Sequence, residues 1–533
     1  MRAAISHYTE RSGNALNDLT AWGSVGQLAI TGPAVRTRWG GQFKSERADC
    51  FAKVSNAGDW RPFLKVWKYG RTMPRLRKVR RPPAFEAKVQ METDALAKLL
   101  AQVPVAITTR YWSDALNPTI RMGWVQASIR AGNYREVHDV LVSLACQPRP
   151  RIVLEIPGSV GPELFFESID KGDEVEVLNT WSVPPLPRKR SPGTDPFVTI
   201  FPPMSFGDGR ELYRVGFGLF NFPDAHGSVV LTKRGKSRSM TAGRIALQSD
   251  DWFVAIDPAH GLRERYQTAR ARGAYLLSHA GVIGRVDGAT FTGEQVEEVT
   301  SGLYWLFAFA LGRRTGPILP YATNRESERP VWTQWAMRAT DSAGGGGTWF
   351  DLHHTESLNG IFGPFMELWR QPALRRVLIR IISWYVQAQD INPVEAAIPA
   401  AQIALETLVA TVPVRPDLDD PALGSNAAGK LARLLIRTGI PIDIPAELQE
   451  LRKASGPKPW RHGPEAITHL RNDVTHPRQD RAWTSAAMIE AWKLSLWYLE
   501  LAMLAWLGYR GQHNRRTRED RSVGLVEPVP WAV

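Results

Sequence analysis

The 533-residue sequence predicts an α+β multidomain fold, with a β-rich N-terminal and middle part followed by an all-α helical bundle. Between about residues 151 and 288, short runs rich in β-branched and aromatic residues are bounded by Gly, Pro and Asp, which is typical of strands. From residue 356 to residue 507, segments with apolar residues at helical spacing follow one another closely. The length also predicts more than one domain, because a single hydrophobic core stops growing at about 250–300 residues.

Four strands are expected in the β-rich part, with the sequences IVLEI, ELYRVGFGLFNF, GSVVLTKRG and WFVAID. In the second run, every other residue from Tyr213 to Leu219 is apolar, which predicts a half-buried strand. The segment 185–196, PLPRKRSPGTDP, is expected to be a turn-rich insert or linker.

A helix is expected to begin at Thr292, where the β-rich part ends. Gln295 follows three residues later, which is the spacing of a capping box. Apolar residues then recur at helical spacing, at Val296, Val299, Leu303, Leu306 and Ala310. The glycine-rich segment 341–349, DSAGGGGTW, is expected to be a flexible joint.

Seven further segments are expected to be helical, and their short connections predict a bundle. They are Glu356–Arg370, Ala373–Gln389, Val394–Ala410, Ala427–Thr438, a short helix from Ala446, Pro464–His476 and Ser485–Leu507. The predicted domains are a basic region of unassigned fold (1–148), a β-rich domain ending in a helix (149–345), an α-helical domain (346–511) and a C-terminal tail (512–533).

The charge of the chain favours a polyanionic partner. The formal net charge is +13 and the pI is about 9.8, and a basic surface attracts phosphates and releases their counterions. Much of the excess lies in RPFLKVWKYGRTMPRLRKVRRP, residues 61–82, which mixes aromatic and basic side chains in a way that suits stacked bases and phosphates. A solvated basic arm explains this segment equally well. The candidate nucleic-acid-binding residues are Arg61, Lys65, Lys68, Arg71, Arg75, Arg77, Lys78, Arg80 and Arg81.

The sequence predicts no membrane span, no signal peptide and no metal or cofactor site. Its apolar stretches at 301–312 and 484–509 are too short or too interrupted, because spanning takes about 20 mostly apolar residues. The first residues, MRAAISHYTERSG, lack an apolar signal-peptide core. Two cysteines are too few for a disulfide framework or a thiolate zinc site. A cytoplasmic protein without a cofactor is therefore expected.

Two segments match a known functional motif only in part. GSNAAGKL, residues 424–431, matches a phosphate-binding loop except at Leu431, where a Ser or Thr should hold magnesium, and no buried strand precedes it. His353, His354 and Glu356 suggest a metal site, but adjacent side chains point apart and no second cluster completes the ligand shell.

The segment HLRNDVTHPR, residues 469–478, carries the strongest chemical signal. On a helix, Asn472 and His476 share one face, nearly opposite the apolar face, and Pro477 should end the helix at His476. The spacing of Arg471 and His476 alone proves little, because a chain with 11 histidines shows it elsewhere by chance. A solvated surface histidine explains it equally well.

The context of this segment resembles a known superfamily. LRNDVTHP is similar to the R-x4-6-H signature of the HEPN superfamily, with a polar residue after Arg471 and a proline after His476. The segment 383–408 resembles the helices that precede the motif, and it includes Glu406. Four further segments resemble a bacterial group related to ApeA-type antiphage proteins: GFGLFNFPD at 216–224, the stretch from Ala274 to Phe291, LFAFALGRR, and the tail LGYRGQHNRR…VEPVPW. The resemblance covers roughly residues 195–533.

This resemblance implies a metal-independent endoribonuclease whose composite site forms where two helical domains dimerise. RNA is cut without a metal when its own 2′-hydroxyl attacks the adjacent phosphorus, which leaves a 2′,3′-cyclic phosphate and a 5′-hydroxyl. Histidine, with an ordinary pKa of about 6.5, transfers protons near neutrality, and arginine stabilises the charge that develops on phosphate. The resemblance thus assigns His476 to acid–base catalysis, Arg471 to phosphate binding and Asn472 to positioning. Glu406 is a supporting candidate, for which a structural salt bridge is the simpler explanation.

The implied partners are RNA, with transfer RNA as one candidate, a second copy of the chain, and a phage-derived trigger sensed by the β-rich domain. The implied role is antiphage defence or abortive infection. Two alternatives remain open. One is a non-catalytic HEPN module that binds RNA or a nucleotide, and the other is a protein-interaction scaffold built on the 20 tryptophans.

Overall fold

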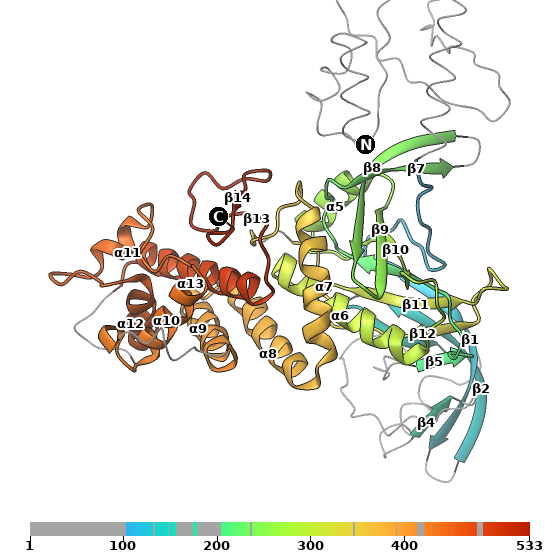
Figure 1. Cartoon of the computed structure of the whole chain (residues 1–533). Helices are drawn as coiled ribbons and strands as arrows, with labels where there is room; N and C mark the ends of the chain where they lie inside the picture. The colour runs from blue at the N-terminus through green and yellow to red at the C-terminus, as the bar shows by residue number, and fades with distance from the viewer. Residues whose placement is uncertain are drawn as a thin grey trace, which may run out of the picture. The chain divides into compact units, whose positions relative to one another are not determined.

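The computed structural model describes residues 103–131, 134–147, 149–155, 174–177, 204–234, 237–344, 347–390, 392–412, 421–476 and 483–532 (Figure 1). Two compact units are distinguished by their internal contacts. The smaller holds the chain up to Ala106 together with Gly227–Arg244, and the larger holds Ile107–His226 and Ile245–Val533.

The smaller unit contains an antiparallel hairpin. Strand β7 (Ser228–Arg234) pairs with the first part of β8 (Ser237–Gln248), in a register that runs from Ser228 opposite Arg244 to Arg234 opposite Ser237. The backbone of Leu231 is also bonded to the preceding segment, since its N–H donates to the Pro104 carbonyl at 2.8 Å. Strand β7 is one of the four expected strands.

The larger unit begins with a four-stranded antiparallel sheet of order β3-β2-β1-β4. Its strands are β1 (Thr119–Ala131), β2 (Tyr134–Ala145), β3 (Arg151–Glu155) and β4 (Glu174–Val177). Strand β3 is expected from the sequence, whereas β1 and β2 lie before residue 149, where no fold is predicted. A local pattern for β2 is nevertheless present in the sequence. Val140, Val142 and Leu144 are spaced two apart, as residues on one face of a strand are, and all three are fully buried.

A second antiparallel sheet forms the centre of the larger unit, with the order β5-β12-β11-β6-β10-β9 followed by the end of β8. Its strands are β5 (Met204–Gly207), β6 (Arg214–Phe220), β9 (Trp252–Pro258), β10 (Leu277–Arg285), β11 (Pro317–Thr323) and β12 (Trp332–Trp335). The prediction of a half-buried strand at β6 is wrong, because both of its faces are buried. Gly216 and Gly218 make this possible, since a Cβ at Gly216 would lie 2.4 Å from the Tyr321 ring and one at Gly218 would lie 2.8 Å from Leu277.

Two helices belong to the β-rich part, α5 (Leu262–Ala271) and α6 (Gly293–Leu311). The predicted start of α6 is confirmed. The Thr292 hydroxyl accepts from the Gln295 N–H at 3.4 Å, and the Gln295 side chain accepts from the Thr292 N–H at 2.9 Å. The sequence does not identify α5, in which four basic or acidic side chains leave only a narrow apolar stripe.

The hydrophobic core of the larger unit crosses the predicted domain boundary between residues 345 and 346. Helix α6 shares one core cluster with the central sheet and with the helices that follow. The prediction of a flexible joint at 341–349 is wrong for its C-terminal end. Trp349 is fully buried, and its indole N–H donates to the Phe309 carbonyl at 3.3 Å. Thr348 also donates to the Ala310 carbonyl, at 2.5 Å.

The helical C-terminal region confirms the predicted fold class. Its helices are α7 (Glu356–Arg370), α8 (Pro372–Ala388), α9 (Val394–Thr411), α10 (Ala427–Arg437), α11 (Gln449–Lys453), α12 (Gly463–Thr475) and α13 (Ser485–Trp506) (Figure 1). These bounds agree with the predicted segments within three residues. The chain then returns onto the bundle through the short pair β13 (Gln512–His513) and β14 (Glu527–Pro528).

Within the described residues, one helix, α9, has the length and hydropathy that a membrane span requires. It packs against α8, α12 and α13, and its Ile398, Ala401 and Leu405 side chains are buried. The core helix of a bundle has the same composition.

Candidate functional site

Helix α12 carries the Arg-Asn-His segment, and both of its ends are explained by the sequence. His462 caps the start, since its Nδ1 accepts from the Glu465 N–H at 3.1 Å, and Pro464 occupies the first turn, where no N–H is needed. At the other end, His476 leaves helical geometry with φ −132° and ψ 73°, while its N–H still donates to the Asn472 carbonyl at 2.8 Å. The prediction that the helix ends at His476 is confirmed.

The faces of α12 are also as predicted. Ile467 and Leu470 are fully buried, and Val474 packs against the same core. Asn472 and His476 are exposed on the other side of the helix. The histidine therefore faces away from the core of its own chain.

The structure brings three of the four predicted residues together (Arg471, Asn472 and Glu406), at the contact between α12 and α9. Arg471 Nη1 donates to Asn472 Oδ1 at 3.0 Å, and Arg471 Nη2 lies 3.8 Å from Glu406 Oε1. Glu406 Oε1 also accepts from the Gln402 amide at 3.3 Å. The Arg471 and Glu406 side chains are 29% and 43% exposed, so solvent reaches the pair and screens it.

His476 stands apart from this cluster. Within the described part of the chain, its imidazole makes no hydrogen bond or ion pair, and it lies one turn beyond Asn472 on the exposed face. A single protomer thus holds the arginine and the amide in contact, whereas the histidine makes no polar contact with the described residues.

An aromatic cluster beside the site was missed by the sequence analysis. The Trp460 ring lies 5.2 Å from the His469 ring and 6.2 Å from the nearly parallel Trp483 ring, measured between centroids. The Trp483 indole N–H donates to Asp473 Oδ2 at 3.2 Å. His469 and Asn472 are three residues apart on α12, so helical spacing alone could have placed the cluster next to the site.

The basic candidates of residues 61–82, from Arg61 to Arg81, lie outside the described residues. Their predicted contact with nucleic acid stays a prediction.

The two motif-like segments have structural explanations. Asn426 caps α10, because its Oδ1 accepts from the Gly429 N–H at 2.8 Å, and a Cβ at Gly429 would lie 2.1 Å from the Leu423 carbonyl oxygen. His354 Nδ1 lies 3.2 Å from Glu356 Oε1, while the His353 ring stacks on His226. Across the described ranges, no group of three or more His, Cys, Asp or Glu residues is placed to hold a metal ion.

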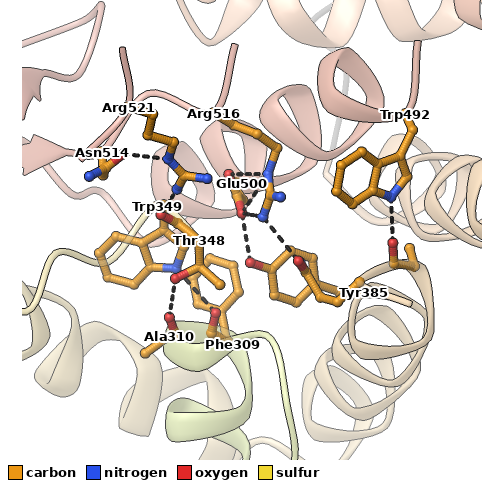
Figure 2. Close-up of polar contacts among 12 residues, drawn as sticks. Phe309, Ala310, Thr348, Trp349, Tyr385, Trp492, Glu500, Asn514, Arg516 and Arg521 are labelled. Carbon is orange, nitrogen blue, oxygen red and sulfur yellow. Dashed lines mark hydrogen bonds and ion pairs between the residues drawn. The ribbon is translucent and has the colours of Figure 1, made fainter. Parts of the chain in front are cut away.

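A buried charge cluster in the C-terminal region was also missed (Figure 2). Arg516 and Glu500 are 3% and 1% exposed, and Arg516 Nη2 lies 2.5 Å from Glu500 Oε1. The Tyr385 hydroxyl donates to the same oxygen at 2.7 Å. Burial, followed by the Glu500 carboxylate, raises the pKa of Tyr385 well above its ordinary value, so the phenol keeps its proton and donates it.

This cluster ties the tail to the bundle. The Arg516 guanidinium also donates to Gln389 at 3.1 Å and lies over the Trp492 ring. Arg521 extends the cluster by donating to Asn514 Oδ1 at 2.5 Å and to the Thr348 carbonyl. The Glu500 carboxylate thus has both Arg516 and Tyr385 as partners, which is what a structural ion pair requires.

A cavity of about 430 Å³ lies elsewhere, between the turn after β8 and helix α7. It is lined by Gln248, Ser249, Asp250, Asn359, Gly363, Pro364, Glu367 and Arg370. None of the predicted site residues reaches it, and its lining has no nucleophile paired with a base.

Comparisons with known proteins match two stretches of the chain. The YopA central domain matches residues 207–345, and the YopA C-terminal domain matches residues 371–527, which include α12 and the Arg516 cluster. The chain is 30% identical over 329 residues to the SPbeta prophage-derived uncharacterized protein YopA of Bacillus subtilis (strain 168), and the match covers 60% of this chain and 72% of that protein. No solved structure matches the chain.

Proposed function

The chain belongs to the YopA family, and from that premise we propose that it is a metal-independent endoribonuclease of the HEPN type. The proposed reaction is attack of the RNA 2′-hydroxyl on the adjacent phosphorus, which gives a 2′,3′-cyclic phosphate and a 5′-hydroxyl. The proposed site is the exposed end of α12, within the segment that the YopA C-terminal domain matches.

The observation that carries the proposal is the arrangement of Arg471, Asn472 and His476 at that end. Arg471 and Asn472 are in contact, and His476 is exposed one turn further on, where the helix ends. The arginine supplies a permanent positive charge and planar donors for a phosphate, and the histidine supplies a proton acceptor and donor. These are the groups that the reaction needs when no metal is present.

A second protomer completes the proposed site. His476 has no side-chain partner in the described part of its own chain, and the exposed stripe of α9 that contacts Arg471 offers a docking face. That stripe carries Ala396 and Ala410, partly exposed Ile403, and Glu406, the residue that contacts Arg471. Dimerisation over α9 would bring a His476 from each chain toward the Arg471–Asn472 pairs.

The biological role that fits this activity is control of phage growth by RNA cleavage in the cytoplasm. The related YopA protein of Bacillus subtilis is prophage-derived, and this origin supports the proposed role. In this proposal the β-rich part senses a phage-derived trigger, and RNA, with transfer RNA as one candidate, is the target.

Cleavage of RNA in EDTA by site variants tests the proposal. Purified full-length protein is incubated with total RNA and with transfer RNA, beside Arg471→Ala and His476→Ala variants. We expect cleavage by the unaltered protein and a loss of about 100-fold or more in each variant, because one general acid–base group contributes about 10²–10⁴-fold. His260→Gln, which removes an exposed imidazole outside the helical bundle, is the control and should cleave normally. A His476→Ala protein that cleaves at the unaltered rate would refute the assignment.

A non-catalytic RNA-binding module is the second candidate. It is favoured by one observation, namely that Arg471 is already partly neutralised by Glu406 within its own chain. This candidate predicts RNA binding that weakens in Arg471→Ala, together with no cleavage in any variant or buffer.

A further inference from the structure

Helix α8 carries two arginines on its exposed face that have no polar partner among the described residues. Arg376 and Arg380 are both exposed, and within the described residues neither makes a hydrogen bond or an ion pair. Their neighbour Arg375 is different, because its guanidinium donates to Glu298 at 2.9 Å and to the Trp369 carbonyl at 2.7 Å. The helix has no acidic residue from Pro372 to Ala388, so nothing on α8 itself neutralises the two free charges.

Trp384 continues this stripe one turn further along. Its side chain is 37% exposed, and it is one of the few large apolar side chains that the described part of the chain leaves in solvent. The Trp384 indole N–H has no hydrogen-bond acceptor among the described residues. Since the three residues are spaced four apart, they lie on one face of the helix and about 6 Å apart along its axis.

One end of this stripe lies near the level of the proposed cleavage site along the helices. Helices α8 and α9 pack together and are joined by a short connection, so they run antiparallel. Arg376 lies at about the same level along this pair as Glu406, the residue that contacts Arg471 on α12. Arg376 is therefore the residue of the stripe at the level of the site, and Trp384 lies nearest to the α8–α9 connection.

We propose that Arg376, Arg380 and Trp384, the α8 stripe, bind the single-stranded RNA substrate next to the site, an inference that rests on the proposed function. The two arginines contact successive phosphates, whose spacing along an extended strand is similar to one helical turn. Trp384 stacks on a base beyond them. Basic side chains followed by an aromatic face are what single-strand binding requires, and they impose little sequence preference.

The test measures single-stranded RNA binding in EDTA as a function of salt, by fluorescence anisotropy. All proteins carry His476→Ala, so that the RNA is not consumed. The Arg376→Gln/Arg380→Gln variant should lower the slope of log K against log salt by about 1.4, because each phosphate contact in a single strand contributes about 0.7. The matched control is Arg270→Gln/Arg272→Gln, which removes two other exposed charges from the end of α5 and should leave the slope nearly unchanged.

The contribution of stacking is measured with two variants of Trp384. Both Trp384→Ala and Trp384→Leu should weaken binding about fivefold or more, because stacking on an aromatic ring is worth about 1–3 kcal/mol per base. Leucine keeps most of the apolar volume, so an equal loss in both variants assigns the effect to the ring. Thermal unfolding of each variant confirms that the fold is retained.

The outcomes separate this inference from the proposed function. One outcome is that the α8 variants bind RNA with the same affinity and salt dependence as the control while the protein with His476 intact cuts RNA. RNA binding by the α8 stripe is then refuted, and the proposed nuclease activity is retained. If the α8 variants lose binding but no cleavage occurs under any condition, RNA binding by the stripe stands and the nuclease falls. Unchanged RNA binding in the α8 variants overturns the inference.

Discussion

At the scale of single residues, two buried histidines set the response of the fold to acid. Both ring nitrogens of His279 are buried without a hydrogen-bond partner in the described residues, and the ring packs against Phe222. Burial lowers the pKa of His279 to about 3 and that of His513 to about 4. Both side chains are therefore neutral in the folded protein above about pH 4.

These shifts predict a loss of stability in mild acid. Between the folded values and about 6.5, the ordinary value, the unfolded chain binds a proton that the folded chain excludes. Stability is therefore fully present above about pH 6.5 and falls as the pH decreases, by about 1.4 kcal/mol per pH unit for each histidine.

The contribution of His279 is isolated by His279→Leu, which replaces the imidazole with an apolar side chain of similar volume. Urea unfolding at pH 7, 6 and 5 should show a shallower loss of stability in this variant than in the unaltered protein. His260→Gln, at an exposed histidine, should keep the full slope. Identical pH profiles for His279→Leu and the unaltered protein would show that His279 is not the acid-sensitive group.

The exposed face of α12 could be predicted at this scale, but its contacts could not. Helical spacing places Asn472 and His476 opposite Ile467 and Leu470, and the structure has them there. The contact between Arg471 and Glu406 joins residues 65 positions apart on two helices, so it depends on how α9 packs against α12. No local pattern specifies that packing.

At the scale of elements, the tail is fixed to α8 and α13 by one buried ion pair. Arg516 of the tail lies against Glu500 of α13 and Tyr385 of α8, and all three side chains are almost fully buried. Removing one member of a buried pair leaves the other charge without compensation, which costs more than the pair contributes.

Arg516→Leu should therefore destabilise the protein by about 3–5 kcal/mol, measured by urea unfolding. The double variant Arg516→Leu/Glu500→Leu should lose less than Arg516→Leu alone, because no buried charge is then left unpaired. Arg518→Leu, at an ion pair with Asp520 on the surface, is the control and should leave the free energy of unfolding nearly unchanged. A double variant at least as unstable as Arg516→Leu would contradict this account of the cluster.

The helices were predictable from the sequence to a greater extent than the strands. From Thr292 onward, caps and apolar spacing are local signals, so α6 to α13 were identified with bounds close to those observed. Strands β10 and β11 are buried along most of their length and show no alternation that distinguishes them from a buried helix. In the sequence, the two glycines of β6 occupy the positions of the polar face of a half-buried strand. In the structure, their missing side chains leave room for Tyr321 and Leu277.

At the scale of the whole molecule, the larger unit is held together by one core that includes the central sheet, α6 and most of the helical bundle. The α+β class was predictable because strand-like and helix-like segments are separated along the chain. The continuity of the core was not, because it depends on long-range contacts such as that of Trp349 with Phe309. A core shared in this way gives the β-rich part a physical connection to the helices that carry the proposed site.

The chemistry of the RNA ends tests the proposed nuclease most directly. Fragments produced in EDTA by the unaltered protein are analysed at both new ends and compared with the reaction of His476→Ala. The account predicts 2′,3′-cyclic phosphate and 5′-hydroxyl ends, which disappear in the variant. Ends with 3′-hydroxyl and 5′-phosphate groups, or cyclic ends produced equally well by His476→Ala, would contradict it.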